Sequence, residues 1–217
     1  LGAVMKQSLK SDKYEKDTEN AVNTVMKMFW NPGLKVLFEN VNKDGSFDLE
    51  SCEGRFVNPG HGLETMWFIM NYLERTGKKD MMQDAFKYVD GIFEFGWDKQ
   101  YGGIFYFMDA LGKPHMELQW DMKLWWPHNE AIIAMLYAYR LSGDRKFWNY
   151  FKMVDEWTWN PFPDKEYGEW FGYLNRRGEP THMLKGGKWK TFFHVPRGLY
   201  FAIEQLKAIK AAGLPTD

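Results

Sequence analysis

Apolar residues recur at intervals of three and four along six stretches of the chain, a spacing that predicts amphipathic helices. The predicted helices span residues 13–30, 60–76, 79–95, 128–142, 144–159 and 196–211. Their ends carry the usual signals: Asn58 and Pro59 suit the start of the second helix, and Gly77 suits its end. The pattern therefore predicts a chain built mainly of helices.

The connectors at residues 97–125 and 160–193 are rich in glycine, aspartate and aromatic residues. Within them, residues 104–107 and 170–174 precede turn sequences that end at Gly112 and Gly178, so each is predicted to form a short β-hairpin. Helices joined by such loops predict an all-α fold, a curved stack of helical hairpins. The loops gather on one face, which is expected to be the functional one.

The pattern repeats with a period of about 66 residues. His61, His128 and His194 lie 67 and 66 residues apart, each near the start of a predicted helix. An Asp-Lys-x-Tyr-Gly motif at Asp98 recurs 66 residues later at Asp164. Such periods are typical of stacked supersecondary units. We therefore predict a single domain, residues 1–217, with three repeats.

Composition narrows the functional classes. The chain has 217 residues, 45% of them hydrophobic, which is enough for a sizeable core. A net charge of −1 without a basic block argues against nucleic acid as a partner. No run of 18 apolar residues is present, so we expect no membrane span. Cys52 is the only cysteine and no signal-peptide pattern is present, which favours a reducing, cytoplasmic setting.

The repeat places three polar pairs at equivalent helix starts: His61 with Glu64, His128 with Glu130, and His194 with Arg197. Each pair alone has a structural explanation, as a polar first turn, a backbone-bonded histidine or a surface ion pair. Equivalent positions of stacked repeats converge, so together the pairs predict one cavity. Aromatic residues make up 18% of the chain, and those beside the histidine segments, Trp125, Trp126 and Trp189, would line it.

Several chemistries are compatible with this set. Three histidines allow a zinc site, but the HExxH spacing is absent and we expect no metal. Glu64 and Glu130 could form the carboxylate pair of a glycoside hydrolase, although histidines dominate. Two histidines across a cavity suit removal and return of a proton beside a carbonyl, because imidazole acts as acid or base near neutral pH. Inversion of a stereocentre is simplest with one base on each side of the carbon.

Four segments carry a family resemblance: residues 58–61 (NPGH), 125–131 (WWPHNEA), 167–173 (YGEWFGY) and 185–197 (KGGKWKTFFHVPR). From about residue 53 to about residue 206 the chain resembles the N-acylglucosamine 2-epimerases, whose animal member is also called renin-binding protein. The resemblance implies an (α/α)6 barrel enzyme that interconverts N-acetyl-D-glucosamine and N-acetyl-D-mannosamine. The open-chain sugar would lose its C2 proton on one face and regain a proton on the other.

The same resemblance assigns roles to residues. It implies that His61 and His194 are the acid/base pair and that Glu130 is an essential polar group. The residues implied to bind the sugar are Glu64, Trp126, His128 and Arg197. It implies an amino-sugar substrate, no required cofactor, ATP as an allosteric activator that is not consumed, and a dimer.

Family members are about twice as long, and this chain resembles their C-terminal half, which predicts three helical hairpins, half of the barrel. We favour a fragment; a ring closed by a second copy and a chain that has lost catalysis are the alternatives. The competing function is a non-catalytic sugar-binding or interaction module. A third is an epimerase or isomerase of the same superfamily that acts on aldoses or disaccharides.

Overall fold

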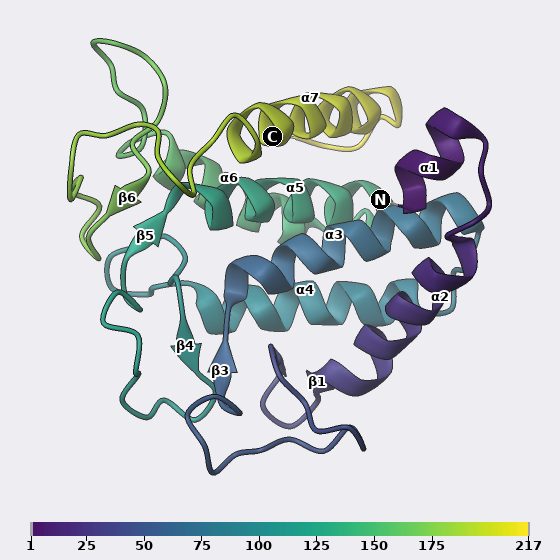
Figure 1. Ribbon diagram of the computed structural model, residues 1–217. Coiled ribbons are helices and arrows are strands. Elements are labelled where there is room, and N and C mark those ends of the chain that lie inside the picture. Colours follow the sequence, from purple (N-terminus) through teal and green to yellow (C-terminus); the bar gives the residue numbers. More distant parts are fainter. Residues whose placement is uncertain (1, 217) are drawn as a thin grey trace.

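The computed structural model describes residues 2–216 and confirms the all-α fold class (Figure 1). The α-helices are α1 (Gly2–Leu9), α2 (Glu15–Thr24), α3 (Pro59–Thr76), α4 (Met82–Gly96), α5 (Trp125–Ser142), α6 (Arg145–Thr158) and α7 (His194–Ala211), and a π-helical turn, η1 (Val25–Phe29), continues α2. None of the helices within residues 2–216 is long and apolar enough to cross a membrane.

The six predicted helices correspond to α2 with η1 and to α3 through α7, whereas α1 was not predicted. The largest differences at a helix start are three residues: α4 begins at Met82 rather than at residue 79, and α5 begins at Trp125 rather than at residue 128. Pro127 is tolerated there because the first-turn N–H groups have no partner inside the helix. The earlier start brings Trp125 and Trp126 into the helix, where Trp126 lies against His61 of α3 and Trp125 lies against Tyr173.

The strands are short: β1 (Trp30–Asn31), β2 (Val36–Leu37), β3 (Phe56–Val57), β4 (Met108–Asp109), β5 (Lys123–Leu124) and β6 (Tyr173–Leu174). They form three antiparallel pairs, β1 with β2, β3 with β4, and β5 with β6. The predicted hairpin at 104–112 is wrong, because β4 pairs with the distant β3. The one at 170–178 is present in part: Leu174 bridges Pro180 and the N–H of Asn175 donates to the carbonyl of Glu179, while β6 also pairs with β5.

These strands fix the starts of two helices. β3 leads into α3 and β5 leads into α5, and each is held by a strand from the connector that follows. A second structural feature, an antiparallel residue pair, recurs with the period of the sequence repeat. An antiparallel pair forms between residues seven positions apart at Trp30 and Leu37, at Trp97 and Ile104, and at Pro163 and Trp170.

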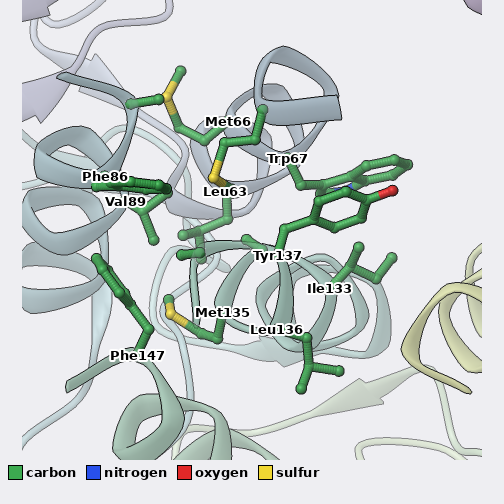
Figure 2. Packing of buried hydrophobic residues seen from close by; sticks show 14 of the residues in the cluster. Leu63, Met66, Trp67, Phe86, Val89, Ile133, Met135, Leu136, Tyr137 and Phe147 are labelled. Carbon is green, nitrogen blue, oxygen red and sulfur yellow. The ribbon is translucent and has the colours of Figure 1, made fainter. Parts of the chain in front are cut away.

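The core surrounds α5, which packs against α3, α6 and α7 and is buried over almost its entire length (Figure 1). Figure 2 shows side chains of α3, α4, α5 and α6 meeting there, among them Leu63, Met66, Val89, Met135 and Phe147. Such an all-round apolar helix is typical of a central core element. The polar residues at its start, His128 and Glu130, are therefore buried as well.

Candidate active site

A cavity of about 540 Å³ lies where α3, α5 and α7 begin. It is lined by His61, Glu64, Tyr106, Gln119, Met122, Leu124, Trp125, Trp126, Tyr173, Trp189 and His194. The volume is in the usual range for a small-molecule site, and the lining combines aromatic rings with a few polar groups, as such sites do. The helix starts thus converge as the repeat predicts.

His61 lies in the first turn of α3, and its main-chain N–H donates to the side chain of the capping residue Asn58 at 3.1 Å. Its ring Nδ1 lies 2.9 Å from Oε2 of Glu39. Because an ionised carboxylate only accepts hydrogen bonds, Nδ1 carries the proton and Nε2 of the neutral ring is an acceptor. Burial lowers the pKa of His61, but the hydrogen bond and charge of Glu39 and the charge of Glu64 outweigh it, so the pKa is raised.

His194 is the first residue of α7, and its Nδ1 lies 2.7 Å from Oε1 of Glu130. The same reasoning assigns the proton to Nδ1 and leaves Nε2 as an acceptor. Glu130 is fully buried, and its other oxygen accepts a hydrogen bond from Nε1 of Trp67 at 2.7 Å. Its donors compensate for the loss of water around a buried carboxylate.

Arg197 joins two carboxylates beside the cavity. Its Nη2 lies 2.5 Å from an oxygen of Glu64 and 2.5 Å from Oε1 of Glu130, and its guanidinium stacks on Phe193 at 4.3 Å. Burial lowers the pKa of Arg197, but Glu130 and Glu64 outweigh it and raise the pKa. Arg197 is not among the residues that line the cavity, so the structure places it behind the carboxylates rather than against a ligand.

Glu64, Glu130 and His194 bring ligand atoms within 4.8 Å of one another, a spacing that could hold a metal ion. However, Arg197 already pairs with both carboxylates, so a cation would have to compete with a guanidinium for the same oxygens. The arrangement suits an ion-pair network better than a metal centre.

Trp126 lies between the two cavity histidines. Its ring centroid is 5.0 Å from that of His61 and 5.7 Å from that of His194. The approach of α3 to this ring requires glycine at position 60, because a Cβ there would lie 2.7 Å from the ring. Trp126 therefore forms the wall that connects the two imidazoles, and Trp189 lines the cavity as predicted.

His128 does not reach the cavity, and the prediction that it binds the sugar is not supported by its surroundings. Its side chain is fully buried, Nδ1 donates to the carbonyl of Leu124 at 2.6 Å, and Nε2 accepts from the N–H of Ile104 at 3.0 Å. The ring stacks on Trp157 at 4.8 Å. Burial lowers its pKa to about 3, so the ring is neutral and has no free nitrogen for a ligand.

Sequence reasoning missed four polar residues at the site: Glu39, Tyr106, Gln119 and Tyr173. Burial raises the pKa of Tyr106 and of Tyr173, so both hydroxyls keep their protons and can donate to a ligand. The repeat held a signal for three of them, since Glu39, Tyr106 and Tyr173 follow one another at intervals of 67 residues. For Gln119, in an irregular loop, no such signal exists.

The family model described as N-acylglucosamine 2-epimerase (GlcNAc 2-epimerase) matches residues 4–197. The chain belongs to the N-acylglucosamine 2-epimerase family. It is 43% identical over 200 residues to the N-acylglucosamine 2-epimerase of Rattus norvegicus, covering 92% of this chain and 47% of the rat protein. It is 47% identical over 176 residues to the Mus musculus protein, covering 81% of this chain and 42% of that one. The chain thus spans less than half the length of these relatives of the epimerase family.

Solved structures confirm the fold. A cellobiose 2-epimerase from Bacillus thermoamylovorans superposes with a TM-score of 0.75 at 20% identity, covering 93% of this chain and 49% of that one. A D-mannose isomerase superposes with a TM-score of 0.79 at 18% identity, covering 92% of this chain and 52% of that one. The helical hairpins of this N-acylglucosamine 2-epimerase family member therefore correspond to about half of an α/α toroid.

Proposed function

We propose that the protein interconverts N-acetyl-D-glucosamine and N-acetyl-D-mannosamine by proton transfer at C2, with His61 and His194 as the two bases. One observation carries this proposal. Both imidazoles line one cavity, and each has its Nδ1 proton held by a carboxylate, which leaves Nε2 free to take a proton. Family membership and the names of the 43–47% identical relatives support the choice of substrate.

The chemistry follows from the position of the C2 proton beside the aldehyde of the open-chain sugar. Nε2 of one histidine takes that proton, and the electron pair of the C–H bond moves toward the carbonyl oxygen, giving an enolate. The other histidine, in its protonated form, then gives a proton to C2 from the opposite face. Both histidines must exchange protons with water before the next turnover, so solvent hydrogen enters the product at C2.

Hydroxyl donors of Tyr106 and Tyr173 suit the developing oxyanion, because both remain protonated in the cavity. Glu64 lines the cavity and is available for the sugar hydroxyls. Glu130 and Arg197 act from behind the cavity wall, where they hold His194 and one another. Trp126 offers an apolar wall of the kind that packs against a sugar ring.

The proposal extends to the setting of the activity. ATP as an activator that is not consumed and a dimeric assembly are expectations from the resemblance, and the single cysteine, Cys52, favours a reducing, cytoplasmic compartment. Since the chain spans less than half of its relatives, we propose that further helical hairpins, from a second copy or from a longer chain, complete the site.

Proton NMR of N-acetylmannosamine with the protein in D2O tests this function, run with and without ATP. The proposal predicts that N-acetylglucosamine forms and that deuterium enters at C2. Free D-mannose and cellobiose under the same conditions serve as competing substrates. A keto product from D-mannose would favour an isomerase instead, and sugar binding without C2 exchange would identify a binding module.

A further inference from the structure

Glu39 is bonded to a cavity histidine, yet the resemblance assigns it no role at the site. It follows β2, and its carboxylate is partly buried, with 24% of the side chain exposed. Its neighbours fix the main chain on both sides. Phe38 is buried and its N–H donates to the carbonyl of Phe29 at 3.0 Å, while the side-chain amide Nδ2 of Asn40 donates to the carbonyl of Glu53 at 3.2 Å. The carboxylate therefore lies on a rigid segment.

The partner of this carboxylate is equally fixed. The main chain of His61 is held by the helix cap, and its ring lies against Trp126. With Oε2 of Glu39 2.9 Å from Nδ1, the ring cannot turn over without losing a charge-assisted hydrogen bond. Glu130 holds Nδ1 of His194 in the same way, at 2.7 Å. Each imidazole is thus held at Nδ1 by a carboxylate, and the two carboxylates come from distant parts of the chain.

We propose that Glu39 is the positioning residue of His61, fixing the tautomer in which Nδ1 is protonated so that Nε2 faces the sugar. This rests on the proposed function only for its catalytic consequence, because the tautomer itself exists without a substrate. Carboxylates that support a metal-binding histidine in this way typically change activity by about 10- to 100-fold when removed, and we expect an effect of that order here. Glu39 itself need not contact the sugar.

The charges around His61 allow a second test of the proposal, through the pKa of its ring. The titratable groups that face the ring are Glu39 and Glu64, and across the cavity Tyr106, Tyr173 and His194. Glu39 supplies both a hydrogen bond and a charge that raise the pKa of His61. Removal of that charge therefore lowers the pKa of His61, and the ring loses its proton at a lower pH.

The test compares Glu39→Gln and Glu39→Leu with the control Glu53→Gln, an exposed glutamate of the same connector. Ring ¹⁵N shifts of His61, followed by NMR as a function of pH without sugar, report tautomer and pKa. We expect the Gln variant to lower the pKa of His61, and the Leu variant also to populate the tautomer protonated at Nε2. In turnover, kcat should fall about 10- to 100-fold with KM changed less than about 2-fold, and the acidic limb of kcat/KM should move to lower pH.

Unchanged tautomer and pKa of His61 in both Glu39 variants would overturn the proposal, as would a wild-type kcat in the Leu variant. The Gln variant keeps the size of the side chain, so it serves if the Leu variant does not fold. If the unmodified chain turns over no amino sugar, the proposed function fails for this chain, while the NMR titration still decides the role of Glu39. The control variant is expected to match the unmodified chain in every measurement.

Discussion

The two cavity histidines differ in their hydrogen-bond partners from His128, which occupies the equivalent position of the repeat in α5. His61 and His194 each give Nδ1 to a carboxylate and keep Nε2 free, whereas His128 gives both nitrogens to the main chain. Full burial keeps His128 neutral in the folded chain, but an unfolded chain takes up a proton at this residue below about pH 6.5. Protonation of the unfolded state is therefore a source of acid sensitivity at this position.

Replacement of His128 by Gln should remove this acid sensitivity. The folded-state pKa of about 3 lies below the unfolded value, so stability falls as the pH drops from about 6.5 toward 3. The free energy of unfolding should lose about 2 kcal/mol between pH 7 and pH 5 through this residue, a loss absent from the variant. Urea unfolding at both pH values measures it, with His182→Gln, an exposed histidine, as the control. An equal loss in all three proteins would contradict the assignment.

Near the cavity, helices α7 and α5 approach each other closely at Gly198. A Cβ on Gly198 would overlap Oδ1 of Asn129 and lie 3.1 Å from its Cγ. Asn129 cannot easily move, because its Nδ2 donates to the carbonyl of Trp125 at 2.9 Å. This contact keeps the first turn of α7, with His194, against Glu130.

Gly198→Ala should therefore destabilise the protein by about 1–2 kcal/mol, the cost of overpacking less the gain in helix propensity. It should also lower the rate of C2 exchange, because α7 moves away from Glu130. Urea unfolding and the D2O assay measure the two effects. Gly187→Ala is the control, since a Cβ there would have no atom within 4 Å. A Gly198→Ala protein as stable and active as the control would show that the contact relaxes freely.

The helices could be predicted because their apolar period depends only on nearby residues, and the cavity because the repeat aligns the helix starts. The strand pairs could not, since β4 and β6 find partners in other connectors and local turn chemistry says nothing of a distant partner. Glu39 lies in register with Tyr106 and Tyr173, but its contact with His61, 22 positions away, could not be read from that spacing. His128 is the backbone-bonded histidine that the sequence allowed as an alternative, and the choice could not be made there because burial of its ring depends on Ile104 and Trp157.

Helix α7 presents apolar side chains to solvent. Leu199, Tyr200, Ile203 and Leu206 are 37–62% exposed on this helix, and Phe192 just before it is 92% exposed. A stripe of this kind marks a surface that packs against another element. It lies on α7, the last helix of residues 2–216, in a chain that covers about half of each solved relative.

The chain alone should therefore self-associate through α7. The double change Tyr200→Lys and Ile203→Lys should weaken the association at least about 10-fold, because two exposed apolar side chains that association would bury are replaced by charges. Sedimentation velocity over a range of concentrations measures this, with Met153→Lys, a singly exposed residue of α6, as the control. A chain that stays monomeric throughout, or a double variant that associates normally, would contradict the prediction.

The most direct test of the central claim is hydrogen exchange at C2 in D2O with His61→Asn and His194→Asn, each given N-acetylglucosamine and N-acetylmannosamine separately. Two bases on opposite faces predict that neither variant forms the other epimer. Each variant should retain exchange with only one sugar, and the two variants should retain it with different sugars. Epimer formation by either variant, or exchange of the same sugar by both, would contradict the assignment of one histidine to each face.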